Sequence, residues 1–459
     1  MEIEIKDFGP IDYVKFDLNK DIHLVYGKNA IGKSYSTYCI YCLLKNIKDK
    51  TVRSRFFYLD VSQEHPFKEF IRNKIKKLKS DKSIDCTKDF FLLVEKELKD
   101  IILNGLQNSL LNTFSSLKNL KNRYSNKNYE IVIHVSSHEK LIIFSNDEGI
   151  LNLKYENDKL KKIEIVQKNT KSTKFAFFIN QKVEFGCPTE EEFTSGFIKH
   201  MVVLLNNFLR NLDFNIRDIY YLPASRSGLY QALNAFTPII AELTKSRFFM
   251  QSKSIQLPSL SEPLADYFID LSTMDKEHVN TKYEEIIALM QNDILQGEVE
   301  YNDETKRIHY KPHGIDLELN LSEASSMVAE LSPLVLYFKH ILNHKYGVDR
   351  GFGFFVHNNF VEPFGQEQTG HDILFIEEPE AHLHPEVQVK LMEIFAKLSA
   401  LNLKIVITSH SNYMFNKLNN LVIKKELDFR KVAVYHLVRS ENGSTVNKEM
   451  DVTDRKSVV

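Results

Sequence analysis

The sequence predicts an α/β protein whose sheet is mostly parallel and covered by helices on both faces. Three apolar strands near the carboxyl end alternate with helical stretches, and strands that are apolar throughout are typical of buried parallel sheets. These strands cover 373–376, 404–408 and 432–437. Near the amino end an apolar run, 22–26, leads into Gly27-Lys28-Asn29-Ala30-Ile31-Gly32-Lys33-Ser34, and a helical stretch, 34–46, follows. A strand, a glycine-containing loop and a helix in this order predict a P-loop NTPase fold.

The segment from Gly27 to Ser34 fits G-x-x-x-x-G-K-[ST], a loop whose backbone amides surround a polyphosphate. Gly27 and Gly32 keep side chains out of the cradle, so that amides can approach phosphate oxygens. Lys33 is expected to neutralise the outer phosphates, and Ser34 to place its hydroxyl on Mg²⁺. We therefore expect ATP and Mg²⁺ as the bound groups, held by the whole loop.

A second polar pattern follows the strand at 373–376. The chain reads Asp372-Ile373-Leu374-Phe375-Ile376-Glu377-Glu378-Pro379, an apolar strand that ends in two carboxylates. Glu377 is expected near the metal, and Glu378 to orient and polarise the attacking water. His410, just past the neighbouring strand, could hydrogen-bond a γ-phosphate. Two solvated carboxylates at a strand end are the alternative, but the loop and the acid pair together predict nucleotide hydrolysis.

The domain organisation predicted from the sequence is a core split by a large insertion. Residues 1–50 and 320–459 are expected to form one nucleotide-binding core. Lys-rich segment 51–128 has apolar residues at helical spacing and predicts two or three helices. Segment 129–319 predicts a β/α lobe: alternating apolar residues over 129–184 favour an antiparallel sheet, and the lobe leads into an apolar helix at 325–342.

Composition limits the partners and the compartment. Sixty Lys and Arg against 61 Asp and Glu give a net charge of −1, so a nucleic acid would need a local basic patch. The basic run 72–82 is either a solvated helix face or a DNA contact. Cys39 and Cys42 are expected to be buried thiols rather than part of a disulfide framework. No apolar run approaches the roughly 20 residues of a membrane span, and no signal-peptide core is visible, so we expect a cytoplasmic protein without membrane contact.

Two strings carry a family resemblance: Glu377-Glu378-Pro379-Glu380-Ala381-His382-Leu383-His384-Pro385 and Thr408-Ser409-His410-Ser411. With the loop, they resemble the ABC-type ATPases of the OLD, RecF and SMC group. Within it they are most similar to the "AAA family" ATPases of bacterial phage-defence operons, the PtuA-like and AriA-like proteins. The resemblance covers roughly 1–50 and 320–440 and is weak through the insertion.

The resemblance implies a homodimer or a higher homo-oligomer, in which each protomer completes another's site. The completing segment would be Ser325-Ser326-Met327-Val328-Ala329-Glu330-Leu331, with Ser326 directed at phosphate. Met327 and Val328 stand where the group has glycines, so slow or partner-triggered hydrolysis is compatible with this segment, and a plain core helix is the alternative. The resemblance also implies a nucleotide-driven switch that controls a separately encoded effector, a nuclease or toxin, since the chain beyond His410 is short for a nuclease domain.

Three alternatives stay open at this point. The chain could be a RecF-like repair ATPase that binds DNA, or a scaffold that binds ATP with negligible turnover. Arg226 could be a cation directed at phosphate, or it could cap a helix or pair with a carboxylate. His382, His384 and Glu380 could hold a metal by residue type, or the histidines could lie at a dimer contact.

Overall fold

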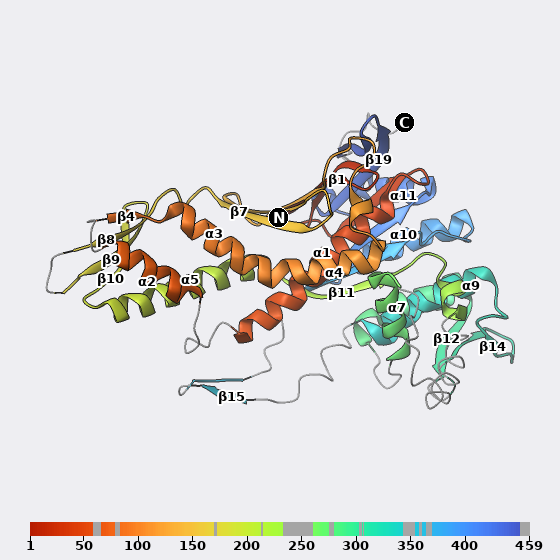
Figure 1. The fold of residues 1–459 in the computed structure, drawn as a ribbon. Helices are drawn as coiled ribbons and strands as arrows, with labels where there is room; N and C mark the ends of the chain where they lie inside the picture. Colours follow the sequence, from red (N-terminus) through yellow and green to blue (C-terminus); the bar gives the residue numbers. More distant parts are fainter. Residues whose placement is uncertain are drawn as a thin grey trace, which may run out of the picture. The chain divides into compact units, whose positions relative to one another are not determined.

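The computed structural model shows two compact units of the chain (Figure 1). It describes residues 1–57, 66–78, 83–168, 172–212, 214–232, 260–274, 280–302, 305, 307–342, 354–357, 360–363 and 370–449. Unit 1 contains Met1–Leu18, Cys42–Phe214 and Glu441–Gly443. Unit 2 contains Asn19–Tyr41, Asn215–Ser440 and Ser444–Val459.

Unit 2 is built on parallel strands in the order β11-β17-β18-β3-β19. Their side chains are buried on both faces in the centre of the sheet: every residue of β18 is buried, and in β17 only the first residue is half-exposed. This burial is the reason that the strands are apolar throughout, and it confirms the predicted parallel sheet. The strands are β3 (Ile22–Gly27), β11 (Ile216–Leu222), β17 (His371–Glu377), β18 (Leu403–Ser409) and β19 (Val432–Ser440).

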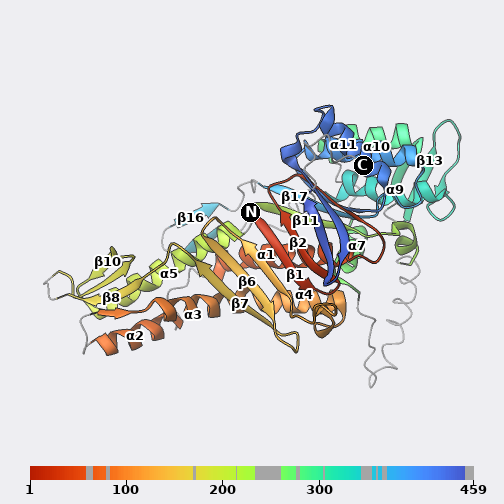
Figure 2. The same cartoon turned by 90° about the horizontal axis from the view of Figure 1, so that it is seen from above.

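Helices of unit 2 share a hydrophobic core with these strands. Leu24 of β3, Ile407 of β18 and Phe395 of α10 belong to that core and are fully buried. Helices α10 and α11 lie side by side in both views (Figures 1 and 2). The helices are α1 (Lys33–Phe57, which begins in this unit), α7 (Glu262–Ser272), α8 (Glu284–Leu289), α9 (Ser326–Leu336), α10 (Pro385–Ser399) and α11 (Asn412–Ile423).

Helix α9 is the most buried of these helices. Every residue from Val328 to Leu336 is buried, and a π-helical turn, Tyr337–Ile341, continues it. A helix that is apolar all round belongs to a protein core. A small antiparallel sheet belongs to the same unit and consists of β12 (Gly297–Asn302), β13 (Arg307–Pro312) and β14 (Leu319–Asn320).

Unit 1 contains two sets of antiparallel strands with helices along them. The first has the order β2-β1-β5-β6-β7, and helix α3 runs along its last strand (Figure 2). The second has the order β10-β9-β8-β4 and packs against α5. The strands are β1 (Glu2–Phe8), β2 (Ile11–Asp17), β4 (Ser83–Asp85), β5 (Glu130–His134), β6 (Glu139–Ser145), β7 (Leu151–Asn157), β8 (Ile163–Gln167), β9 (Phe175–Ile179) and β10 (Lys182–Cys187). The helices are α2 (Pro66–Leu78), α3 (Thr87–Leu98), α4 (Asn104–Phe114) and α5 (Glu190–Leu212).

The single antiparallel sheet predicted over 129–184 is therefore divided between two sheets. The reason lies at the free edge of β7, where side chains of the helices satisfy the backbone. Tyr155 N donates to Glu95 Oε1 and Leu151 N to Gln107 Oε1, both at 3.1 Å. An edge whose amides are satisfied by side chains offers no template for another strand, so β8 pairs elsewhere.

The two units do not divide the chain where the sequence was expected to divide. Strands β1 and β2 belong to unit 1, whereas β3 and the loop that follows it belong to unit 2. A core made of 1–50 and 320–459 stays a prediction. Cys39 and Cys42 are buried thiols that form no disulfide, as predicted. In the part of the chain that the structure describes, no helix is long and apolar enough to cross a membrane.

Candidate functional site

The predicted site residues lie at the carboxyl ends of neighbouring parallel strands of unit 2. Gly27 ends β3, Ser409 ends β18 and Glu377 ends β17. Parallel strands end at one edge of a sheet, and the crevice outside that edge is where α/β proteins bind ligands. The strand order thus brings together segments that lie more than three hundred residues apart in the chain.

The loop from Gly27 to Ser34 has the backbone that a phosphate cradle needs. Gly27 has φ of 155° and Gly32 φ of 96°. A Cβ on Gly27 would lie 2.8 Å from the carbonyl oxygen of Leu437, so the chain requires glycine there. Ile31 is buried and anchors the loop, while the three residues before it, Lys28, Asn29 and Ala30, are exposed.

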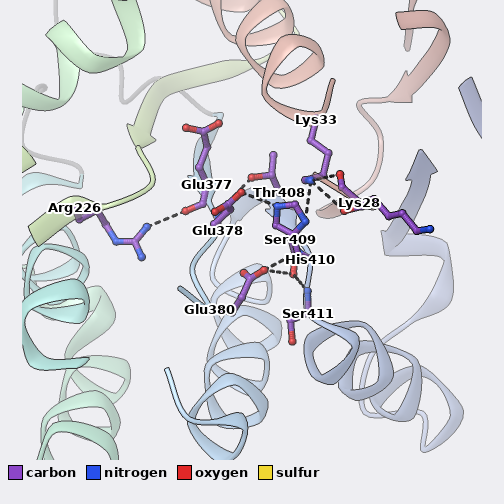
Figure 3. Close-up of polar contacts among 11 residues, drawn as sticks. Lys28, Lys33, Arg226, Glu377, Glu378, Glu380, Thr408, Ser409, His410 and Ser411 are labelled. Atoms are coloured by element: carbon purple, nitrogen blue, oxygen red, sulfur yellow. Dashed lines mark hydrogen bonds and ion pairs between the residues drawn. The ribbon is translucent and has the colours of Figure 1, made fainter. Parts of the chain in front are cut away.

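Lys33 is buried and turns back onto its own loop (Figure 3). Its ammonium donates to the carbonyl oxygens of Gly27, at 3.1 Å, and Lys28, at 2.9 Å. Burial lowers the pKa of Lys33, although the carboxylates of Glu378, Glu380 and Glu377 oppose this effect. The Lys33 ammonium is therefore shielded from water and held by carbonyl oxygens. An ion pair with phosphate is stronger when little water screens the two charges, so a bound polyphosphate would pair strongly with Lys33.

His410 joins Lys33 to Glu378 in a continuous row (Figure 3). Lys33 Nζ lies 3.2 Å from His410 Nδ1, and His410 Nε2 lies 2.7 Å from Glu378 Oε1. An ammonium can only donate, so Nδ1 accepts from it and Nε2 carries the proton that is donated to the carboxylate. The structure thus brings together three of the predicted site residues.

Glu378 has a backbone conformation that is rare for a residue with a side chain. Its φ is 40°, in the left-handed region, and its amide donates to the carbonyl oxygen of Thr408 at 3.0 Å. Conformations of this kind persist only where the surroundings hold them, and they are concentrated at functional sites. Its side chain remains 39% exposed, so water can reach the carboxylate.

Glu377 lies in different surroundings, although it is the adjacent residue. It is 5% exposed, and its carboxylate accepts hydrogen bonds from the hydroxyls of Ser34 and Tyr38 and from the amide of Ala224. Burial raises its pKa. The two residues predicted to hold Mg²⁺, Ser34 and Glu377, are therefore in direct contact, and their oxygen atoms are of the kind that Mg²⁺ prefers. Tyr38, whose Oη lies 3.1 Å from Glu377 Oε2, was not predicted from the sequence.

Glu380 positions the segment that carries His410. Its Oε1 accepts from Ser409 Oγ and from the amide of His410, both at 2.7 Å, and the residue is 9% exposed. In the sequence, Glu380 was considered only as one of three residues, with His382 and His384, that could hold a metal, the alternative being a dimer contact of the histidines. His384 Nδ1 caps α10 and His382 is exposed, and the described residues contain no group of three or more potential ligands that could hold a metal.

The structure also decides between the two roles left open for Arg226. The residue is 1% exposed and its guanidinium lies 3.4 Å from the carboxylate of Glu330. It also donates to backbone carbonyls, including that of Glu377 (Figure 3). Arg226 is thus a buried partner of a carboxylate, not a cation open to phosphate. Glu330 was missed, because it lies among apolar residues at helical spacing.

Ser326 is the first residue of α9, and no hydrogen bond joins its side chain to the residues above in the described part of the chain. Ser325, the N-cap, accepts from the amide of Val328 at 3.4 Å. Both serines are exposed, whereas the helix after them is buried. The exposed helix start therefore offers amides and a serine hydroxyl to a group outside the protomer.

Comparison with known proteins gives one family. The model described as "AAA ATPase domain" matches residues 1–415. No curated protein matches the chain significantly.

Similar solved structures are heads of SMC proteins. An SMC head bound to the C-winged helix domain of ScpA has a TM-score of 0.38 and 11% identity, with 98% of this chain and 97% of that chain covered. The SMC head domain from Thermotoga maritima has a TM-score of 0.34 and 11% identity, with 97% and 96% covered. A head with an extended coiled coil, bound to a ScpA domain and derived from Pyrococcus furiosus, has a TM-score of 0.34 and 12% identity, with 97% and 94% covered. TM-scores this low do not establish a shared fold.

Proposed function

Since the chain belongs to the AAA ATPase domain family, and is therefore an ATPase with a P-loop NTPase fold, we propose a role for each residue of its site and a use for its turnover. The observation that carries the proposal is the row of Lys33, His410 and Glu378 beside the phosphate loop. Each role below follows from the contacts of these residues.

The reaction is the attack of water on the γ-phosphate of ATP. Lys33 exchanges its bonds to the loop carbonyls for bonds to the outer phosphates, and the amides from Gly27 to Ser34 surround them. His410 carries its ring proton on Nε2, and this N–H turns from Glu378 to donate to a γ-phosphate oxygen. Glu378 accepts a proton from the attacking water, because its partly exposed carboxylate ends next to that position.

Ser34 and Glu377 would hold Mg²⁺, which neutralises charge on the β- and γ-phosphates when it is bound. The fit is supported by the hydrogen bond between their side chains, since a hydroxyl and a carboxylate in contact can bind one ion. Tyr38 also donates to the Glu377 carboxylate and helps to fix its orientation. A hydroxyl that supports a ligating carboxylate in this way tunes its geometry.

The protein acts as a homodimer, and ATP binding and hydrolysis switch this dimer between two states. Ser326 and the exposed start of α9 support this, because a helix N-terminus with a free hydroxyl suits a phosphate presented by a second copy. The closed dimer controls a separately encoded effector, a nuclease or toxin, in bacterial anti-phage defence in the cytoplasm. The motif from Glu377 to Pro385 supports this assignment through its resemblance to phage-defence ATPases.

Two other functions each have one supporting observation. An ATP-binding scaffold with negligible turnover is favoured by Met327 and Val328, whose side chains stand where glycines would let phosphate approach closely. A RecF-like ATPase that binds DNA is favoured by α2, on which Arg72, Lys76 and Lys77 are exposed. DNA binding that weakens steeply as salt rises, and that requires ATP, would support the second.

Equilibrium binding of ATP to Lys33→Ala tests the assignment of the phosphate site, with Lys28→Ala as a matched control. Both lysines belong to the loop, but Lys28 is exposed and Lys33 is buried against the loop carbonyls. We expect Lys33→Ala to lose ATP binding and turnover, and Lys28→Ala to keep both within about threefold, since an exposed side chain costs little to remove. Normal ATP affinity in Lys33→Ala would remove the loop from its proposed role.

A further inference from the structure

Arg226 joins the strand that carries the acid pair to helix α9. Its Nη1 donates to the backbone carbonyl of Glu377 at 2.9 Å and to that of Pro223 at 3.0 Å. Its Nε donates to the carbonyl of Glu330 at 3.1 Å. A single buried side chain therefore links the end of β17, the segment after β11 and α9.

Glu330 completes this link from the side of the helix. Its Oε2 accepts from the backbone amide of Arg226 at 3.1 Å, and its Oε1 accepts from Ser227 Oγ at 2.6 Å. The two charged side chains are 2% and 1% exposed. A buried charge is tolerated only when it is paired and hydrogen-bonded, so neither partner can move away without a large cost.

The carbonyl that Arg226 holds belongs to the peptide group between the two acids. The amide of the same group, Glu378 N, donates to Thr408 O at 3.0 Å. Because a peptide group is planar, bonds at its carbonyl and its amide fix its orientation from two sides. This explains why Glu378 keeps its φ of 40°: if one of the two bonds were absent, the group could rotate and the carboxylate would leave His410.

We propose that Arg226 is a positioning residue that couples the start of α9 to Glu378 by holding the peptide group between Glu377 and Glu378. Glu330 lies four residues after Ser326, about one helical turn from the exposed start of the helix. A displacement of α9 when its start engages a phosphate therefore reaches Arg226 directly. Arg226 passes that displacement to the carbonyl of Glu377, and so to the carboxylate that orients the water.

The chemistry of the side chain explains why arginine is needed. The guanidinium presents donors in a fixed fork, whereas a lysine ammonium is a single charged centre that cannot reach all three carbonyls. Arg226→Lys keeps the charge beside Glu330 and loses the fork. Glu330→Gln keeps the acceptor for Ser227 and removes the charge that holds Arg226.

The test compares these variants with a matched ion pair at the other end of the same strand. Arg217 Nε donates to Asp372 Oδ1 at 2.9 Å, and Asp372 is fully buried near the start of β17. Five residues separate Asp372 from Glu377, about 17 Å along the strand. Arg217→Lys therefore replaces an arginine that is bonded to β17, as Arg226→Lys does, but far from the acid pair.

The proposal rests on the proposed function, so two readouts are taken from each full-length variant. The first is kcat for ATP beside the equilibrium Kd for ATP. The second is hydrogen exchange of the α9 amides with and without Mg-ATP, which does not depend on hydrolysis. We expect Arg226→Lys and Glu330→Gln to lower kcat by roughly 10- to 100-fold with Kd nearly unchanged, because displacement of a catalytic group by about 1 Å has this effect.

Hydrogen exchange should show that ATP alters the α9 amides in the wild type and in Arg217→Lys, but not in Arg226→Lys. An unchanged kcat in Arg226→Lys or in Glu330→Gln, when that variant is folded, would overturn the coupling. A fall in the kcat of Arg217→Lys as large as in these two variants would also overturn it. So would a normal α9 response in Arg226→Lys. If the wild type binds ATP and α9 responds without ADP formation, the proposed hydrolysis fails while the coupling stands. If Arg226→Lys does not fold, Glu330→Gln decides the outcome.

Discussion

Glu377 and Glu378 are consecutive residues, yet the structure gives their carboxylates different surroundings. Glu377 is buried under two hydroxyls and one amide, whereas Glu378 is partly exposed beside His410. Two carboxylates in different environments can take different roles in one site. The buried oxygen-rich environment suits a metal ligand, and the accessible one suits a group that receives a proton from water.

Burial of Glu377 predicts how stability without nucleotide depends on pH. Its pKa is raised above the ordinary value of 4.5, so the folded state binds the proton more tightly than the unfolded state does. Well below pH 4.5 the residue is protonated in both states, so folding buries no charge at this position. As pH rises through the folded pKa the ionised group must stay buried, and this contribution destabilises the protein.

We therefore expect Glu377→Gln to unfold at a higher temperature than the wild type near pH 8 without Mg²⁺, and at about the same temperature near pH 4. Thermal unfolding of both proteins over this range is the measurement. Glu386→Gln is the control, because Glu386 is an exposed carboxylate whose removal should leave no such gap. A difference between wild type and Glu377→Gln that does not change with pH would contradict the prediction.

Gly27 provides a second prediction for a single residue. Its φ is 155°, and the Leu437 carbonyl oxygen lies 2.8 Å from the position that an alanine methyl group would take, so alanine cannot be accommodated without moving the loop. We expect Gly27→Ala to abolish ATP binding and to lower the free energy of unfolding by about 1–3 kcal/mol. At Gly228 a Cβ would meet nothing within 4 Å, so Gly228→Ala should bind ATP normally. Equal ATP affinities for the two variants would refute the steric argument.

At the scale of the element, local sequence predicted most of the helices and strands near the site. Apolar runs followed by polar residues indicated β17, β18 and β19, because a strand buried on both faces is apolar throughout. The helix predicted from residue 34 onward corresponds to the first part of α1, Lys33–Phe57. Pairing between distant strands was not predictable, since alternation in β5 to β10 shows that strands exist but not which strand is the neighbour. The division into two sheets depends on Glu95 and Gln107, whose contacts arise only in the fold.

The start of α9 carries a prediction that separates stability from catalysis. Ser325 caps the helix, so Ser325→Ala should lower the free energy of unfolding by about 1 kcal/mol. Ser326 is not the capping residue, and its replacement by alanine should leave stability unchanged. Loss of the Ser326 hydroxyl should instead reduce ATP turnover, because this hydroxyl would contact the phosphate bound by the second copy. Chemical denaturation and steady-state ATPase assays check both, and unchanged turnover in Ser326→Ala would exclude it from the site.

At the scale of the whole molecule, the site joins segments from both ends of the chain within unit 2. Lys33 and His410 meet although 377 residues separate them. The motifs predicted this meeting, since each motif is recognisable alone and their chemistry is complementary. The link between Arg226 and Glu330, 104 residues apart, was not predictable, because no motif pairs an arginine of the one segment with a glutamate of the other. The reacting groups were therefore predictable from motifs, whereas the groups that orient them required the structure.

We infer that Glu378, held by these contacts, activates water for attack on ATP bound at Lys33. Single-turnover formation of ADP by wild-type protein and by Glu378→Gln, at saturating ATP, tests this role most directly. We expect a rate at least about 100-fold lower in Glu378→Gln, with ATP affinity retained, because the amide cannot accept the proton. Equal rates of ADP formation in the two proteins would show that Glu378 does not activate the water.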